Sequence, residues 1–393
     1  MTLLKRRVES AAGRDHHVAK ALFSSWLRNH FAAFYASILF SIVAALIPAS
    51  GLTQVVATAP YSVTTFATAP SGLSAPDSIT FSATNVFVGY GNGGAPDGSG
   101  GAKSDIVEYD FRGNTISTFT IVGHNDGLRY NPRTNQLWAV QNEDGNANLV
   151  IINLGTDEQK IFQLGTGPHG GGYDDIDFNN NAVYLSASAP TINPNTAPAI
   201  VSLQMNRHGV VLTGILNGDA TATNVITGTT ETLNLQDPDS MILNPLGELV
   251  MTSQGDGELI IVQHPGLSCQ NALVVPLTSA AGGSTIGNTQ LDDTVFANQS
   301  AGELLVADKQ LNTVFAITAP YFGPSAYSAA SVFSSPSAPN PTESFVGQTN
   351  LSTGFVTPIV TGMGNPGGMA FIPSGVNLAK YLLASVQIPE VCA

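Results

Sequence analysis

The amino-acid sequence predicts an all-β fold, and two observations lead to it: the composition and an internal repeat. Charged residues make up only 11% of the 393 residues, whereas 40 Gly and 23 Pro are present. A chain poor in charged helix formers and rich in turn residues is typical of short strands joined by tight turns. Closed β architectures often use a chain of this length as one domain.

A five-residue pattern recurs six times along the chain. It consists of an Asp, a small or acidic residue, an apolar residue, any residue, and an aromatic or aliphatic residue. Its apolar positions alternate with period two, as in a half-buried strand. The copies are Asp77–Phe81, Asp126–Tyr130, Asp174–Phe178, Asp239–Leu243, Asp292–Phe296 and Gly367–Phe371, and the last one lacks the Asp.

Further strands follow each copy after short turns. Four antiparallel strands in about fifty residues are the size of a propeller blade, so six copies predict a six-bladed β-propeller over residues 52–393. Second strands are predicted at 85–90, 136–141, 181–186, 247–253, 302–308 and 380–385, and third strands at 105–110, 149–154, 199–204, 259–264 and 313–318. The Ser-, Ala- and Pro-rich stretch 321–350 is predicted to be a long loop.

The two ends of this domain complement each other. The sixth copy stops after its second strand, whereas SVTTFAT (62–68) resembles a fourth strand without three strands ahead of it. We therefore expect this N-terminal strand to complete the last blade. Such closure removes two exposed sheet edges.

The N-terminal segment 1–51 is predicted to be a signal peptide or an N-terminal membrane anchor. Its first thirty residues are basic, and FAAFYASILFSIVAALIPA (31–49) follows without a charge. A basic segment before an apolar run directs export, and a hydrophobic helix is expected over that run. The sequence leaves cleavage open, so the protein is expected to be secreted, periplasmic or anchored to the membrane through this segment alone.

The charge balance limits the partners. The first fifty residues hold six basic and two acidic residues, which leaves 8 basic and 26 acidic residues and a net charge near −18. Such a domain is repelled by nucleic acid and by anionic lipid. Cations and neutral or cationic ligands fit better, and we expect a monomer.

Cys269 and Cys392 are the only cysteines. Two cysteines in an exported chain often form a disulfide. The predicted blades place them two blades apart, however, and that separation argues against a bond because a disulfide needs closely spaced Cα atoms.

Acidic residues mark the start of the predicted inner strands, where they crowd around the central channel. Bringing carboxylates together is costly unless a cation or protons neutralise them. Hard oxygen ligands favour Ca²⁺ or another divalent cation such as Mg²⁺ over zinc, and no nucleotide or quinone cofactor is indicated. The candidate metal ligands are Asn125, Asp126, Asp174, Asp239 and Asp292, and Asp77 holds the equivalent position in the first blade. The alternative is structural, because an Asp before a strand often accepts turn N–H groups.

Departures from the repeat are better candidates for function than its regular members. They are His124, Asn125 and the doubled acids Asp174/Asp175 and Asp292/Asp293. A His beside carboxylates at a channel mouth can act as a general base, so His124 and Asp126 are the candidate catalytic residues. His169, in the glycine-rich approach to the third copy, is either close to a ligand or simply solvated.

The strand pairs resemble those of the NHL-repeat and gluconolactonase-like six-bladed propellers. The residues that carry this resemblance are 124–142, 238–253 and 292–308, which match an "Asp-Gly, inner strand, turn, Leu-x-Val-Ala-Asp" unit. The resemblance implies a divalent metal in the channel, held by Glu, Asn and Asp at positions that match Asn125, Asp126, Asp174 and Asp239. Asp77 stands where that family has a Glu in its first blade.

Two functions follow from these observations. The first is a non-catalytic binding module for a small molecule, glycan or protein at the channel face. The second is a metal-dependent lactonase or esterase of the gluconolactonase-like type, in which an Asp or His124 would activate water.

Overall fold

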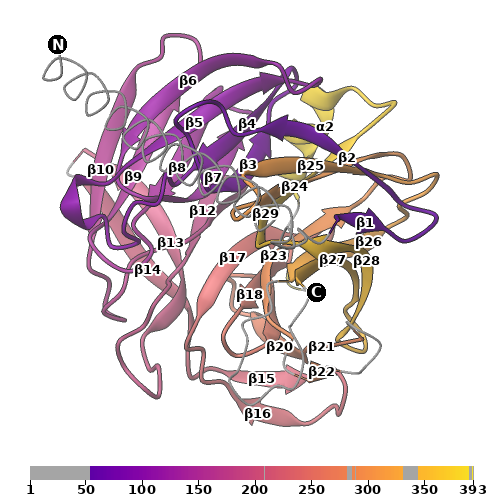
Figure 1. The fold of residues 1–393 in the computed structure, drawn as a ribbon. Coiled ribbons are helices and arrows are strands. Elements are labelled where there is room, and N and C mark those ends of the chain that lie inside the picture. Colours follow the sequence, from indigo (N-terminus) through magenta and orange to yellow (C-terminus); the bar gives the residue numbers. More distant parts are fainter. Residues whose placement is uncertain are drawn as a thin grey trace, which may run out of the picture. The chain divides into compact units, whose positions relative to one another are not determined.

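The computed structural model describes residues 54–207, 209–280, 286–287, 289–330, 344–388 and 392. These residues form six sheets, whose inner strands contact one another in sequence, with the last against the first, so that they enclose a channel (Figure 1). The predicted six-bladed β-propeller is thereby confirmed. The inner strands are β3 (Pro76–Phe81), β7 (Asn125–Asn131), β11 (Ile176–Asn179), β17 (Pro238–Leu243), β23 (Leu291–Ala297) and β29 (Pro366–Pro373).

The first four blades are antiparallel and follow the chain order. Blade one continues with β4 (Asn85–Tyr90), β5 (Lys103–Asp110) and β6 (Thr115–Val122), and blade two with β8 (Gln136–Gln141), β9 (Ala147–Asn153) and β10 (Gln159–Gly165). Blade three continues with β12 (Ala182–Ser186), β13 (Pro198–Asn206) and β14 (Gly209–Asn217), and blade four with β18 (Leu249–Ser253), β19 (Glu258–Gln263) and β20 (Asn271–Pro276). A short 3₁₀ turn, η1 (Ser99–Gly101), precedes β5.

The last two blades exchange strands, which corrects the predicted pairing. β24 (Gly302–Asp308) and β25 (Thr313–Thr318) join β29 in blade six rather than β23, and β2 (Ser62–Thr68) lies outside β25. Blade five is completed by β26 (Ser325–Ala330), β27 (Ser344–Asn350) and β28 (Phe355–Met363), so part of the predicted loop 321–350 is strand. Pairing between neighbours along the chain was assumed, but the chain crosses to the next blade and returns.

Short added strands cover the outer edges of blades four and five. In blade four, the hairpin of β15 (Thr221–Asn224) and β16 (Thr230–Thr232) pairs with β20 through a parallel contact. In blade five, β21 (Thr278–Ser279) pairs with β22 (Ile286–Gly287) and, in parallel, with β28, which also pairs with β1 (Val56–Ala57). Each addition shields backbone groups that an edge strand would otherwise expose.

The predicted sixth second strand, 380–385, is instead a helix, α2 (Leu378–Ser385). The Asn377 side chain caps it by accepting from the Lys380 amide, and its apolar residues at i, i+3 and i+4 fit a helix as well as a strand. The tail after α2 crosses to blades three and four, where Cys392 forms a disulfide with Cys269 at a Cα–Cα distance of 5.8 Å. The expectation against this bond was wrong because it placed the tail within blade six.

Apolar side chains fill the spaces between neighbouring blades, as where Trp138 of blade two meets Phe178 of blade three edge to face at 5.3 Å. In the part of the chain that the structure describes, no helix is long and apolar enough to cross a membrane. The predicted signal or anchor at 1–51, with its hydrophobic run at 31–49, lies outside the described residues.

Candidate functional site: an acidic chamber in the channel

One end of the channel, where the inner strands begin, holds a chamber of about 250 Å³ that we call the upper chamber. Second strands run antiparallel to inner strands and therefore end at the same mouth, so both contribute residues. Among the described residues the lining includes two cationic side chains, Arg129 and Lys309, against ten carboxylates. The carboxylates are those of Asp77, Asp126, Glu143, Asp144, Asp174, Asp175, Asp237, Asp239, Asp292 and Asp293.

Arg129 forms the floor of this chamber. Its guanidinium donates to the carbonyl oxygens of Ile176 and Met241, both at 3.0 Å, and to the Asp175 carboxylate at 3.2 Å. The Asp177 carboxylate lies 3.7 Å from Nε. These contacts join inner strands of three blades and hold a fixed positive charge below the acidic lining.

In four of the six repeats the second residue faces the next inner strand, which explains why it is small or acidic there. The Asp175 carboxylate accepts the Met241 amide at 2.9 Å, and the Asp293 carboxylate accepts the Met369 amide at 2.6 Å. At Gly127 the neighbouring backbone is so close that a Cβ would lie 2.4 Å from the Asp174 carbonyl oxygen. Asp175 and Asp293, expected among the functional residues, thus tie neighbouring blades together.

One half of the upper chamber carries its own cation. Lys309, in the turn after β24, places Nζ 3.0 Å from Asp77 Oδ2 and 3.4 Å from Asp292 Oδ1. The Gln254 side chain also donates to Asp292 Oδ1, at 3.1 Å. We call Asp77, Asp292 and Lys309 the lysine half, because a tethered ammonium group neutralises its carboxylates.

The opposite half has three carboxylates and no such partner. Glu143, Asp174 and Asp239 each offer a carboxylate oxygen, and these oxygens lie within 4.8 Å of one another. Within the described part of the chain, no Lys or Arg forms an ion pair with them, and no backbone N–H donates to the carboxylates of Asp174 or Asp239. Those two Asp residues therefore do not serve as turn caps. We call these three residues the open half.

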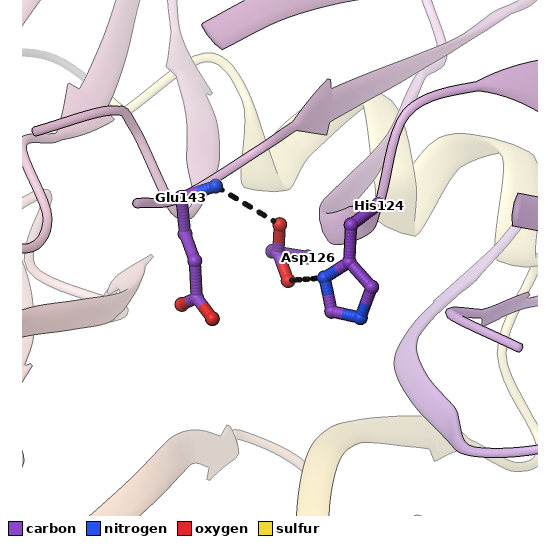
Figure 2. Close-up of side chains that lie close together, drawn as sticks. All are labelled: His124, Asp126 and Glu143. Atoms are coloured by element: carbon purple, nitrogen blue, oxygen red, sulfur yellow. Dashed lines mark hydrogen bonds and ion pairs between the residues drawn. The ribbon is translucent and has the colours of Figure 1, made fainter. Parts of the chain in front are cut away.

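His124 and Asp126 border the open half. His124 Nδ1 lies 2.9 Å from Asp126 Oδ1, and Asp126 Oδ2 accepts the Glu143 amide at 3.3 Å, so Asp126 lies between the two (Figure 2). Side-chain atoms of all three also fall within 4.8 Å of one another. Asp126 lines the chamber, whereas His124 is not among the lining residues and packs behind it, against Gly91.

The protonation of the chamber follows the same division. Burial raises the pKa of Asp292, and the nearby Lys309 ammonium opposes the rise, leaving the pKa at about 6. Burial and the Asp239 carboxylate raise the pKa of Asp174 well above its usual value, while burial and the Asp292 and Glu143 carboxylates do the same for the pKa of Asp239. Without a cation, the open half is therefore held together by protons.

The His124–Asp126 pair is also perturbed. Burial alone would lower the pKa of His124, but the Asp126 carboxylate raises it to about 9. Burial and the Glu143 carboxylate raise the pKa of Asp126 to about 8, against the opposing effect of His124. A histidine that keeps its proton at neutral pH is a poor general base.

Besides His124, two further residues singled out in the sequence lie away from the chamber lining. The Asn125 side chain donates to the carbonyl oxygens of Gly127 and Val140, both at 3.1 Å, and packs against Gly89 between blades one and two. His169 is fully buried, with Nε2 2.7 Å from the Gly172 carbonyl oxygen. Asp126, Asp174, Asp239 and Asp292 are the predicted metal ligands that the structure brings to the chamber.

Glu143 and Lys309 were not predicted from the sequence to be residues of this site. Both follow the end of a second strand, β8 and β24 respectively, outside the five-residue pattern. The signal was nevertheless present, because a strand antiparallel to the inner strand must end at the mouth where the inner strand begins.

No family model matches this chain, and no curated protein matches it. The solved structures that resemble it include a protein of unknown function from Bacteroides caccae, which is 9% identical, with 76% of this chain and 86% of that chain covered and a TM-score of 0.45. A putative gluconolactonase is 10% identical, with 81% and 91% covered and a TM-score of 0.42. A virginiamycin B lyase from Staphylococcus aureus is 12% identical, with 66% and 99% covered and a TM-score of 0.32.

Proposed function

We propose that this protein is a binding module whose upper chamber holds a divalent cation in its open half. The observation that supports the proposal most strongly is the cluster of Glu143, Asp174 and Asp239, which are partly or fully buried and whose carboxylate oxygens lie within 4.8 Å of one another. Three carboxylates at such distances repel one another, and a divalent cation removes that repulsion.

The donor atoms fit Ca²⁺ or Mg²⁺. All three side chains offer hard carboxylate oxygens, which these ions prefer, and neither a thiolate nor an imidazole belongs to the set. Asp126, which borders Glu143, could add a fourth oxygen. Lys309 supports this assignment indirectly, because the opposite half already contains a positive charge.

The chamber also limits the ligand. With a volume of about 250 Å³ it admits a small molecule, a sugar unit or one side chain of a larger partner. The excess of carboxylates favours neutral polar or cationic groups and repels anions. A cation in the open half would let hydroxyl or carbonyl oxygens of the ligand complete its coordination.

The proposal includes an extracytoplasmic location and a closed ring. The N-terminal sequence favours export, and extracellular modules commonly bind Ca²⁺ with dissociation constants of about 10⁻⁴–10⁻³ M. The pairing of β2 with β25 in blade six supports closure by the N-terminal strand, which would keep the chamber rigid.

The cation site is tested by making the same substitution, Glu to Gln, at one proposed ligand and at one exposed position. Chelator-treated protein is titrated with Ca²⁺ and with Mg²⁺ by calorimetry, and one site is expected in the unaltered chain. Glu143→Gln should weaken binding by about tenfold or more, because one charged ligand is lost. Glu158→Gln, at a side chain that is 62% exposed, is the matched control and should bind normally. Equal binding by both variants, or no saturable binding, would rule out the cation site.

A second candidate is metal-dependent hydrolysis of lactones or esters. It is favoured by the ionisable pair beside the open half, in which Asp126 lines the chamber and His124 lies 2.9 Å behind it. A bound cation would polarise the ester carbonyl. The cation would also favour the ionised form of Asp126, which would then accept a proton from the attacking water, while His124 would orient Asp126 rather than touch the substrate.

A panel of lactones and aryl esters tests this alternative, with Ca²⁺ present and with Asp126→Ala as the control. Turnover that requires the cation and is lost in Asp126→Ala would establish a hydrolase. Cation binding without turnover would leave the binding module as the function.

A further inference from the structure

A second chamber lies at the other end of the channel, where the inner strands end. This lower chamber has a volume of about 140 Å³ and is lined by residues from the inner strands of all six blades and from the C-terminal segment 381–388. Ile79, Arg129 and Met369 line both chambers and so form the layer between them. Its walls are largely aliphatic and aromatic, with Phe81, Ile242, Val295, Phe296, Phe371 and Leu382 among the lining residues.

The charged groups of the lower chamber are already satisfied by the protein. Arg129 donates from Nε and Nη2 to two carbonyl oxygens and to Asp175, as described above, so its charge is paired within the protein. The two oxygens of Asp177 accept the amides of Phe178 and Leu243, at 2.8 and 2.7 Å. Each charge is therefore already paired or hydrogen-bonded within the protein, so neither requires an ion of opposite charge from a ligand.

The uncharged polar groups are satisfied as well. The Tyr381 hydroxyl donates to Asn298 at 2.8 Å, and the Ser385 hydroxyl donates to the Leu382 carbonyl oxygen at 2.9 Å. Asn244 bonds the turn that follows β17, through the amides of Leu246 and Glu248. A chamber whose polar groups bond mostly to the protein itself offers an incoming molecule mainly apolar contact.

Helix α2 and the tail after it cover this chamber. Leu382 and Val386 are buried, and they pack into the apolar clusters of different blades. Asn180 donates from its backbone and its side chain to the carbonyl oxygens of Val386 and Ile388, at 2.8 and 2.9 Å. The disulfide to Cys269 then fixes Cys392 to blade four.

We propose that the lower chamber is a binding site for a small apolar molecule of about one aromatic ring, covered by α2. The size argument is direct, since an apolar cavity of about 150 Å³ stays dry and takes up benzene or xenon. The lining includes the aliphatic and aromatic side chains that such a molecule needs, beside the internally paired Arg129 and Asp177. The cover gives the molecule a route that does not pass the acidic chamber.

The experiment uses the full chain in the presence of a chelator, so that its outcome is independent of the proposed cation site. Benzene is titrated by calorimetry, and xenon is introduced into crystals under pressure. Saturable uptake of benzene and a xenon peak beside Leu382 and Phe371 are expected. Absence of both would overturn the proposal.

Two substitutions on α2 locate the site. Ser385→Phe places a ring toward the chamber and should weaken benzene binding by about tenfold or more, because it occupies the same volume. Ala384→Phe adds the same ring on the exposed side of the same helix and should leave binding unchanged. Equal binding by the two folded variants would place the benzene site elsewhere.

Leu382→Ala serves if Ser385→Phe does not fold. It enlarges the chamber instead of filling it, and it should shift preference from benzene toward a larger ring such as naphthalene. An unchanged preference would contradict the proposed location.

Cys392→Ser tests the cover. Freed from blade four, α2 should open more often, so benzene should exchange several-fold faster while its affinity changes little. An exchange rate equal to that of the unaltered chain would show that α2 is not the route.

Discussion

The two halves of the upper chamber begin from the same repeat position and end in different electrostatic states. Asp77 and Asp292 in the lysine half, and Asp174 and Asp239 in the open half, are all the first residue of the repeated pattern. Lys309 lies 3.0 and 3.4 Å from the first two, whereas the last two face Glu143, a third carboxylate. The residue after a neighbouring second strand therefore decides whether a repeated Asp is paired or left available for a cation.

The largest expected effect comes from removing the tethered cation. Lys309→Met should destabilise the protein by about 3 kcal/mol, because it leaves the partly buried Asp77 carboxylate and the buried Asp292 carboxylate without their cation, with only Gln254 still donating to Asp292. Denaturant unfolding measures the loss. Lys160→Met, at an exposed pair with Glu158, should change stability by less than about 1 kcal/mol. A loss for Lys309→Met no greater than for Lys160→Met would mean that the lysine half does not depend on its cation.

Removing one carboxylate from each half should change the free energy of unfolding in opposite directions when a chelator is present. Asp292→Asn weakens the attachment of Lys309 and should destabilise by about 1–3 kcal/mol. Asp174→Asn removes one member of the repelling cluster and should stabilise the cation-free protein by about 1 kcal/mol. Thermal unfolding at pH 8 distinguishes the two. The same sign in both variants would show that the halves are equivalent.

The sequence predicted the ring and the convergence of its first acidic residues. Five blades each contributed their Asp because the pattern marks the start of each inner strand, and strand starts meet at one mouth. The repeated pattern could not predict which of these acidic residues have a cationic partner. Glu143 and Lys309 lie beyond the pattern, and the blade that carries Lys309 was assigned incorrectly.

The strand exchange and the disulfide have a common cause. Local patterns identified β24 and β29 as strands but predicted a loop where β26 lies, and they do not state which strand crosses to another blade. That pairing depends on contacts between residues far apart in the chain, such as Val306 with Met369. The short apolar run of α2 was equally ambiguous, because it fits a strand as well as a helix. Since it is a helix and not a strand of blade six, Cys392 is not held in that blade and bonds to Cys269.

The pH dependence should sharpen the comparison further. Burial raises the pKa values of Asp126 and Asp293 to about 8 and about 7, above their unfolded values, so the folded state binds more protons than the unfolded chain. Stability in chelator should therefore fall as pH rises from about 4 to 8. Saturating Ca²⁺ should reduce this slope, since the cation replaces the protons of the open half, where burial and neighbouring carboxylates raise the pKa of Asp174 and Asp239. Melting temperatures measured from pH 5 to 8, with and without Ca²⁺, test this, and parallel curves would contradict it.

The smallest expected effect concerns His124. His124→Gln removes the partner that lies 2.9 Å from Asp126 and should cost about 1 kcal/mol at pH 7. The raised pKa of His124 makes its contribution complete below about pH 6.5 and lost as pH rises through about 9. Denaturant midpoints at pH 7 and pH 9.5 should therefore differ from the unaltered chain at the first pH and converge at the second. An equal loss at both pH values would point to packing alone.

The most direct test of the open half is the position of a bound cation. Crystals of the unaltered protein, soaked in Mn²⁺ as an anomalous substitute for Ca²⁺ or Mg²⁺, should show one peak in the upper chamber. We predict that it lies within about 2–2.6 Å of carboxylate oxygens of Glu143, Asp174 and Asp239. A peak between Asp77 and Asp292, or no peak in the chamber at saturating Mn²⁺, would contradict the division of the chamber into a paired half and an open half.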